Sequence, residues 1–260
     1  MAKDRVINAG NFCWGELYAK DINKLSKFYT SLFGWEIESI SLPENEPYYI
    51  FKTHNVGISG GIQLNKEMGN LRPHWNSYVL VNDIHESVTA AKKLGARVMK
   101  DVINVLNKGK MAVILDPTDA AFSLWEAMDA NEQSSLTQSM PGNIGWNELV
   151  TNDTDKSGQF YTDLFKWTVS CQEWLPGETY TTFLNADGPV AGMRRPTEKL
   201  NTAGPRWWLY FTVSNLKEHM AKAEEMGGHV GHDPITIPGI GRFAMIRDPD
   251  GVCFSIIERD

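Results

Sequence analysis

The chain has 260 residues, of which 42% are hydrophobic and 22% charged, a globular composition long enough for two domains of ordinary size. Its formal net charge of −7 argues against nucleic acid or an anionic membrane as a partner. Three scattered cysteines form no CxxC pair or disulfide framework, and the sequence shows neither a signal-peptide pattern nor an apolar run of about 20 residues, so we expect a cytoplasmic protein.

The first elements lie between Trp14 and Trp35. Alternation of side-chain types from Trp14 to Tyr18 predicts a strand. Asp21 is a candidate N-cap, and Gly34 is a candidate C-terminal glycine. The apolar residues between them fall on one helical face: Ile22, Leu25, Phe28, Tyr29, Leu32 and Phe33. Strands are expected near 35–39, 48–52 and 62–64, and we interpret the glycine-rich 57–61 segment as a backbone turn.

A second unit of the same kind follows. Residues 74–81 are strand-like, and Asp83 is a candidate N-cap for a helix that Gly95 closes. Extended segments are expected at 97–100, 103–106 and 111–115, and a last strand at 121–126. Each unit therefore has the order β-α-β-β-β.

The second half of the chain repeats the first at an offset of 132 residues. Residues 146–167 match 14–35, and anchors recur along the whole length, among them Tyr48/Tyr180, Gly60/Gly192, Trp75/Trp207, Asp116/Asp248 and Ser123/Ser255. A period this long indicates a duplicated domain. We expect domains at 1–128 and 143–260, joined by a polar linker at 129–142. In the second copy, Gly158 inside the helix and Lys166 at its end should each weaken that helix by roughly 1 kcal/mol.

Four β-α-β-β-β units, a Phe-Tyr pair on the first helix of each half and a closing Asp248-Pro-Asp-Gly turn resemble the vicinal oxygen chelate superfamily. That group includes glyoxalases, bleomycin-resistance proteins and extradiol dioxygenases, and the repeated motifs are similar to its tandem hydroxylase-like branch. The resemblance implies an α+β fold. In each half a mixed sheet should curl around a ligand cleft, with the helices outside.

The resemblance also implies where a metal would bind. Its metal-dependent members place ligands seven residues before each helix-capping residue and seven after the first aspartate of the closing turn. Here those positions hold Trp14, Asn76, Trp146, Trp208, Ser123 and Ser255. Indole, amide and hydroxyl groups are poor ligands for Fe, Ni or Zn, so we expect no metal cofactor. The alternative is a divalent-metal-dependent lyase, isomerase or dioxygenase of the glyoxalase type, with a non-standard site that uses Glu16 or Glu148.

Strand parity predicts which side chains face the clefts. The expected ligand-binding residues are Trp14, Glu16, Tyr18, Asn76, Tyr78, Ser123 and Trp125 in the first half, and Trp146, Glu148, Trp208, Tyr210 and Ser255 in the second. Aromatic walls with a few polar groups predict a small organic ligand, and one carboxylate per cleft favours a cationic or hydroxyl-bearing one. No catalytic residue is identified.

One other interpretation of the clefts stays open. The tryptophans could fill the clefts as core, in which case the protein would act through its outer surface. In either case we expect a monomer or homodimer. Parity also places Glu126 and Glu258 on the face opposite Ser123 and Ser255, towards the helix layer or solvent.

Overall fold

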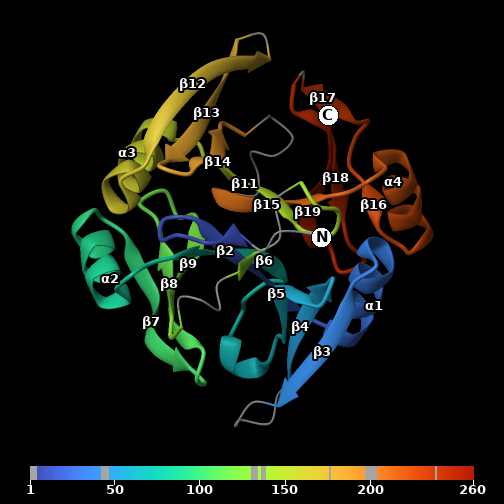
Figure 1. The fold of residues 1–260 in the computed structure, drawn as a ribbon, viewed down its shortest axis with the longest axis horizontal. Coiled ribbons are helices and arrows are strands. Elements are labelled where there is room, and N and C mark those ends of the chain that lie inside the picture. Colours follow the sequence, from blue (N-terminus) through green and yellow to red (C-terminus); the bar gives the residue numbers. More distant parts are fainter. Residues whose placement is uncertain are drawn as a thin grey trace.

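The computed structural model describes residues 5–41, 47–129, 134–135, 139–175, 177–196, 204–237 and 239–260. Within these residues the first half forms an eight-stranded sheet in the order β3-β4-β5-β2-β6-β9-β8-β7 (Figure 1). Its strands are β2 (Phe12–Ala19), β3 (Glu36–Ser41), β4 (Pro47–Thr53), β5 (Val56–Gln63), β6 (His74–Leu80), β7 (Arg97–Val105), β8 (Gly109–Leu115) and β9 (Ala121–Ala127). The helices are α1 (Ile22–Phe33) and α2 (Ile84–Lys93), and a short 3-10 turn, η1, spans Lys66–Met68.

The second half repeats this arrangement. In the described residues its nine-stranded sheet runs β12-β13-β14-β11-β15-β19-β18-β16, with β17 paired to β18. The strands are β11 (Ile144–Val150), β12 (Thr168–Leu175), β13 (Glu178–Asn185), β14 (Gly188–Arg194), β15 (Arg206–Thr212), β16 (His229–Val230), β17 (Ile235–Ile237), β18 (Gly241–Arg247) and β19 (Cys253–Arg259). The helices are α3 (Thr154–Phe165) and α4 (Leu216–Glu225). A small ribbon pairs β1 (Arg5–Val6) with β10 (Ser134–Ser135), and the rest of the segment 130–138 lies outside the described residues.

Each half builds its sheet from its own two units. The first and second units meet at the antiparallel pair β2–β6, where Glu16 lies opposite Asn76, and at β11–β15, where Glu148 lies opposite Trp208. The α+β fold of two curled mixed sheets, expected from the repeat and the resemblance, is confirmed, and the units pair within each half.

Two details of the sequence interpretation were wrong. The glycine-rich 57–61 segment is part of β5 and is not a turn. A Cβ on Gly60 would overlap the hydroxyl of Tyr48 and would press on Trp14, so the glycine makes room for these side chains on a strand. The segments 97–100 and 103–106 are one strand, β7, whose register shifts twice against β8.

The helix termini follow the sequence signals. Asp21, Asp83 and Asp153 each accept a backbone N–H from the third residue after them, at 3.0, 2.9 and 3.0 Å. Gly34 ends α1 in the left-handed conformation (φ 70°), and Lys166 takes the same conformation at the end of α3 (φ 59°). Since a side chain is strained there, Lys166 is an unfavourable substitute for the glycine.

Glu126 and Glu258 contact the helix layer, as strand parity indicated. The carboxylate of Glu126 accepts the N–H of Ile84 at 2.8 Å, and that of Glu258 accepts the N–H of Leu216 at 2.6 Å. Each carboxylate therefore holds the first turn of a helix, where negative charge is favourable.

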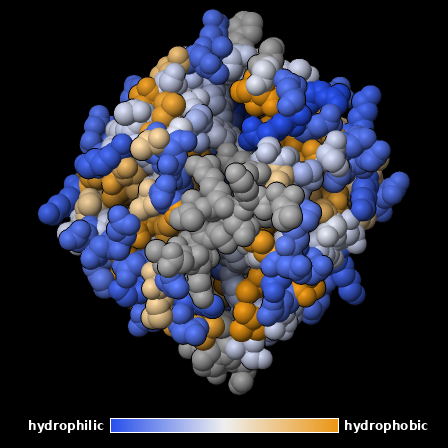
Figure 2. Space-filling view, in the orientation of Figure 1, coloured by the Kyte–Doolittle hydropathy of each residue, from blue (hydrophilic) through white to orange (hydrophobic). Residues whose placement is uncertain are grey.

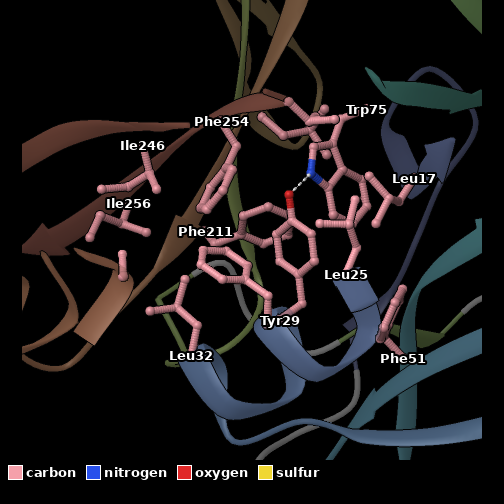
Figure 3. Packing of buried hydrophobic residues seen from close by; sticks show 14 of the residues in the cluster. Leu17, Leu25, Tyr29, Leu32, Phe51, Trp75, Phe211, Ile246, Phe254 and Ile256 are labelled. Carbon is pink, nitrogen blue, oxygen red and sulfur yellow. Dashed lines mark hydrogen bonds between the residues drawn. The ribbon is translucent and has the colours of Figure 1, made fainter. Parts of the chain in front are cut away.

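The helix-side cores are shared between the halves. Helix α1 packs Leu25, Tyr29 and Leu32 with Phe51 and Trp75 of its own half, and against a second-half group: Leu209, Phe211, Ile246, Phe254 and Ile256 (Figure 3). Figure 1 shows α1 beside α4 and α2 beside α3. A second cluster joins α3 and β14 to α2 and β9 in the same way. The helices thus bury their apolar faces between the two sheets, which leaves the opposite sheet faces for the clefts.

Among the described residues, every helix is too short or too polar to cross a bilayer. Hydrophilic side chains cover most of the coloured surface in Figure 2, and hydrophobic ones form small separate groups.

Candidate functional site

The positions where the resemblance places metal ligands are occupied by side chains that hydrogen-bond to each other or to a tyrosine. In the first half, Asn76 Nδ2 donates to Ser123 Oγ at 2.7 Å, and Trp14 Nε1 donates to Tyr48 Oη at 3.1 Å. In the second half, Trp208 Nε1 donates to Ser255 Oγ at 3.0 Å and Trp146 Nε1 to Tyr180 Oη at 2.8 Å. The second cleft therefore contains a closed polar pairing where the resemblance would place a metal, and the first contains a pairing that leaves Asn76 Oδ1 without a partner.

These side chains do not fit a divalent metal. An indole N–H is only a donor, and the serine hydroxyls already accept hydrogen bonds from Asn76 and Trp208. Within the described ranges, no three His, Cys, Asp or Glu side chains come close enough together to hold an ion. Glu16 and Glu148, the acidic candidates from the sequence, lie in different halves with different partners.

In the first cleft Glu16 is surrounded by phenol groups. It is only 4% exposed and accepts the Tyr78 hydroxyl at 2.5 Å. Burial raises the pKa of Glu16, although hydrogen bonds from Tyr78, Tyr18 and Tyr48 act in the opposite direction. No ion pair involves Glu16 among the described residues. It is therefore a buried carboxyl group that favours its proton more than an exposed glutamate does.

The remaining residues predicted for the first cleft have different environments. Tyr18 stacks on His74 with ring centres 4.8 Å apart, and burial lowers the pKa of His74. Asn76 has a buried Oδ1 with no hydrogen-bond partner. Half-buried Trp125 lies opposite Met111 in the sheet register, and its ring leaves no space for a side chain at Gly109.

In the second cleft the carboxylate is neutralised. Glu148 accepts Arg194 Nε at 2.8 Å and the Tyr210 hydroxyl at 3.1 Å, and both members of the ion pair are buried. Burial would lower the pKa of Arg194, but the Glu148 carboxylate more than offsets it and the pKa is raised. Strand parity predicted that Glu148 faces this cleft, and the structure places it there, but parity did not predict Arg194. The sequence did contain a sign of Arg194, because the equivalent position in the first half is the uncharged Ile62.

The second cleft contains a partly open cavity of about 240 Å³. Its walls are mainly aromatic and aliphatic: Trp146, Trp174, Tyr180, Tyr210, Phe243, Ile237, Ile240, Ile257 and Pro189, with Glu148, Gln172, Thr182 and Arg259. Of the residues predicted for this cleft, Trp146, Glu148 and Tyr210 line the cavity, and Trp208 and Ser255 are not on its wall. Trp174, Tyr180 and Phe243 come from β12, β13 and β18, strands on which the sequence predicted no cleft residue, and Arg259 comes from the end of β19, four residues after the predicted Ser255.

Comparison with known proteins agrees with the fold. A model of the glyoxalase/bleomycin resistance protein/dioxygenase superfamily matches residues 143–256, and a glyoxalase-like domain model matches residues 16–125. "Putative glyoxylase CFP32" from Mycobacterium tuberculosis (strain CDC 1551 / Oshkosh) is 31% identical over 99% of this chain and 98% of its own length. The chain belongs to the glyoxalase/bleomycin resistance protein/dioxygenase superfamily.

Another superfamily member with a similar sequence is "Anthracycline biosynthesis protein DauV" from Streptomyces sp. (strain C5), which is 30% identical over 94% of this chain and 92% of its own length. Solved structures share the fold. A Mn(II)-bound glyoxalase from Novosphingobium aromaticivorans is 13% identical with a TM-score of 0.66, over 98% of this chain and 83% of that one. A homoprotocatechuate 2,3-dioxygenase variant from B. fuscum is 15% identical with a TM-score of 0.66, over 100% and 74%.

Proposed function

We propose that this superfamily member binds a small organic molecule in its aromatic-lined clefts without a metal, and that the cavity of the second half is the main site. The observation that carries the proposal is the pairing of Trp208 with Ser255 at a metal position beside that cavity. The position is occupied by a closed hydrogen bond, and aromatic walls beside it offer flat apolar area to a ligand. The name of DauV refers to anthracycline biosynthesis, which is in line with a small organic ligand.

The test uses protein dialysed against EDTA and the neutral probe 2-naphthol, followed by calorimetry. We expect binding that EDTA does not change. Thr182→Phe, which fills the cavity, should abolish it. The matched control is Ile50→Phe, at the equivalent position of the first half, which should leave binding intact. Binding that requires an added divalent ion, or that survives Thr182→Phe, would contradict the proposal.

A second candidate rests on the first cleft. Glu16 is a buried carboxyl group with a raised pKa and no ion pair, which is how enzymes prepare a proton-transferring group. An enzyme of the glyoxalase type could use it as the base or, with a divalent metal, as a non-standard ligand. Turnover of 2-oxoaldehydes that is lost in Glu16→Gln and retained in Glu148→Gln would support this candidate. Metal analysis of the same preparations shows whether Glu16 acts as a base without a metal or as a ligand of a bound metal.

We further propose that the protein acts in the cytoplasm as a monomer or homodimer, with a small molecule as its partner and neither nucleic acid nor membrane. The support is the net charge of −7 and three cysteines that are all free thiols. The two-domain division at 1–128 and 143–260 is supported by the two family models and by one sheet in each half.

A further inference from the structure

We propose that the cavity of the second half is specific for a compact aromatic anion, such as an aryl carboxylate. This inference rests on the proposed binding function and specifies its ligand. The first observation is a pair of unsatisfied donors. Trp174 Nε1 and Arg259 Nε are both buried with no hydrogen-bond partner, and both residues line the cavity. Buried donors are unfavourable without an acceptor, so a ligand that brings oxygen acceptors to these two residues is favoured.

The second observation is charge. Glu148, the acidic residue on the cavity wall, is already neutralised by Arg194 at 2.8 Å. Arg259 makes no ion pair among the described residues, and its Nη2 donates to the backbone oxygen of Gly145 at 2.6 Å. Two guanidinium groups and one carboxylate leave a net charge of +1. The cationic ligand expected from the carboxylate alone is therefore disfavoured here.

The environment of Arg259 also favours a negatively charged ligand. Partial burial lowers the pKa of Arg259, which means that this half-buried cation is short of compensating negative charge. An anion in the cavity would supply that charge and a planar bidentate partner for the guanidinium group. A neutral ligand of the same shape would fill the space without offsetting the cost of the buried charge.

The third observation is shape. The cavity of about 240 Å³ is smaller than the roughly 300–1,000 Å³ of most ligand pockets. Its aromatic walls include Trp146, Tyr180, Tyr210 and Phe243. Flat rings stack well on such walls, so the structure favours one or two fused rings that carry the charged group at one end.

The first half lacks this chemistry. At the offset of 132, the residues equivalent to Trp174, Arg194 and Arg259 are Leu42, Ile62 and Ala127. Leu42 lies outside the described residues, so that comparison is one of sequence only. Selectivity for an anion is thus a property of the second half, and the duplication has produced two clefts of different polarity.

The experiment compares three probes of one shape: 2-naphthoate, 2-naphthamide and 2-naphthylmethylamine, which is cationic at pH 7. Calorimetry on the full chain should show 2-naphthoate binding at least about 10-fold more tightly than the amide, because hydrogen bonds to a charged acceptor are the stronger ones. The cation should bind more weakly still. Equal affinity for all three would overturn the anion specificity and leave the proposed binding function in place. If none binds, both fail.

Two variants test whether Arg259 and Trp174 produce the preference for the anion. Arg259→Gln should remove most of the roughly 10-fold difference between 2-naphthoate and the amide. Trp174→Phe keeps an aromatic ring and removes only the N–H, so it should lower 2-naphthoate affinity several-fold even if Arg259→Gln folds poorly. Arg97→Ala is the control, because it removes an arginine that is exposed and ion-paired to Asp119 in the first half. A preference for the anion that persists unchanged in both cavity variants would contradict the assignment.

Discussion

Tyr29, on the first helix of the first half, donates a hydrogen bond of 2.9 Å to the buried carboxylate of Asp248, in the closing turn of the second half. The same hydroxyl accepts the indole N–H of Trp75 at 3.0 Å. The duplication repeats the relationship in reverse, since Tyr161 donates to Asp116 at 3.0 Å. The phenol of each half therefore hydrogen-bonds to the closing turn of the other half, within a shared helix-side core. Figure 3 shows Tyr29 in the first of these cores, with its hydrogen bond to Trp75.

Removing one of these hydroxyls should therefore destabilise the whole chain. Tyr29→Phe leaves the Asp248 carboxylate and the Trp75 N–H each short of a partner, and we expect a loss of about 1–3 kcal/mol in the free energy of unfolding. Urea denaturation followed by tryptophan fluorescence measures it. Tyr161→Phe should cost a similar amount, and Tyr49→Phe, which loses an exposed hydrogen bond to Asn23, is the control. Equal stability of Tyr29→Phe and the parent would show that the bond contributes nothing.

The carboxyl group of Asp248 predicts a pH dependence. Burial raises its pKa to about 6, against about 4 in an unfolded chain. An acid with a higher pKa in the folded state contributes stability while protonated. That contribution is complete below about pH 4 and is lost as the pH rises through about 6. It amounts to about 3 kcal/mol.

The check is the difference in unfolding free energy between the parent and Asp248→Asn, measured in urea from pH 4 to pH 8. Because asparagine does not titrate, the stability of the parent relative to this variant should fall by up to about 3 kcal/mol over that range. Asp155→Asn, at an exposed position of α3, is the control for the loss of a carboxyl group. A parent-to-variant difference that is flat with pH would rule out the raised pKa.

The fold was predictable because its signals are local and repeated. Asp21 and Gly34 bound a helix by capping chemistry, and the offset of 132 residues shows the same pattern twice. What the sequence did not predict was the glycine-rich strand. The sequence alone does not distinguish a glycine that makes room for a neighbouring ring from a glycine in a turn. Only the structure shows that the Tyr48 ring occupies the space beside Gly60.

The site was predictable only in part. Strand parity predicted that Glu16 and Tyr78 lie on the same face of the sheet. The two residues are on adjacent central strands, where side chains alternate between the two faces with a period of two. Arg194 and Trp174 come from β14 and β12, strands on which the sequence predicted no cleft residue, and a period of two does not show how curvature brings such strands together. Their one sequence signal was the comparison of the two halves at the offset of 132, where Ile62 corresponds to Arg194. Arg259 is four residues after Ser255 on β19, so parity would have placed it on the same face.

Two glycines of the second half should respond in opposite ways to alanine. A Cβ on Gly192 would overlap the Tyr180 hydroxyl and crowd Trp146 Nε1, so Gly192→Ala should break the bond between those side chains. We expect a loss of about 1–3 kcal/mol. Gly158 lies inside α3, and a Cβ there meets only Met193 Cε at 3.5 Å. Gly158→Ala should gain about 0.5–1 kcal/mol from helix propensity. Thermal unfolding of both variants gives the signs, and like signs would refute the contrast.

The ion pair of the second cleft can be tested by copying the first half. Arg194→Ile, which installs the residue found at position 62, leaves Glu148 buried without its cation and should cost about 3–5 kcal/mol. Adding Glu148→Gln removes the stranded charge, so the double variant should recover much of that loss, since neutral replacements of buried pairs are often tolerated. Chemical denaturation of the parent, both single variants and the double variant completes the cycle. Additive losses, with no recovery in the double variant, would mean that Arg194 stabilises the cleft by packing on the Trp174 ring, 5.5 Å from its guanidinium carbon, and not by its charge.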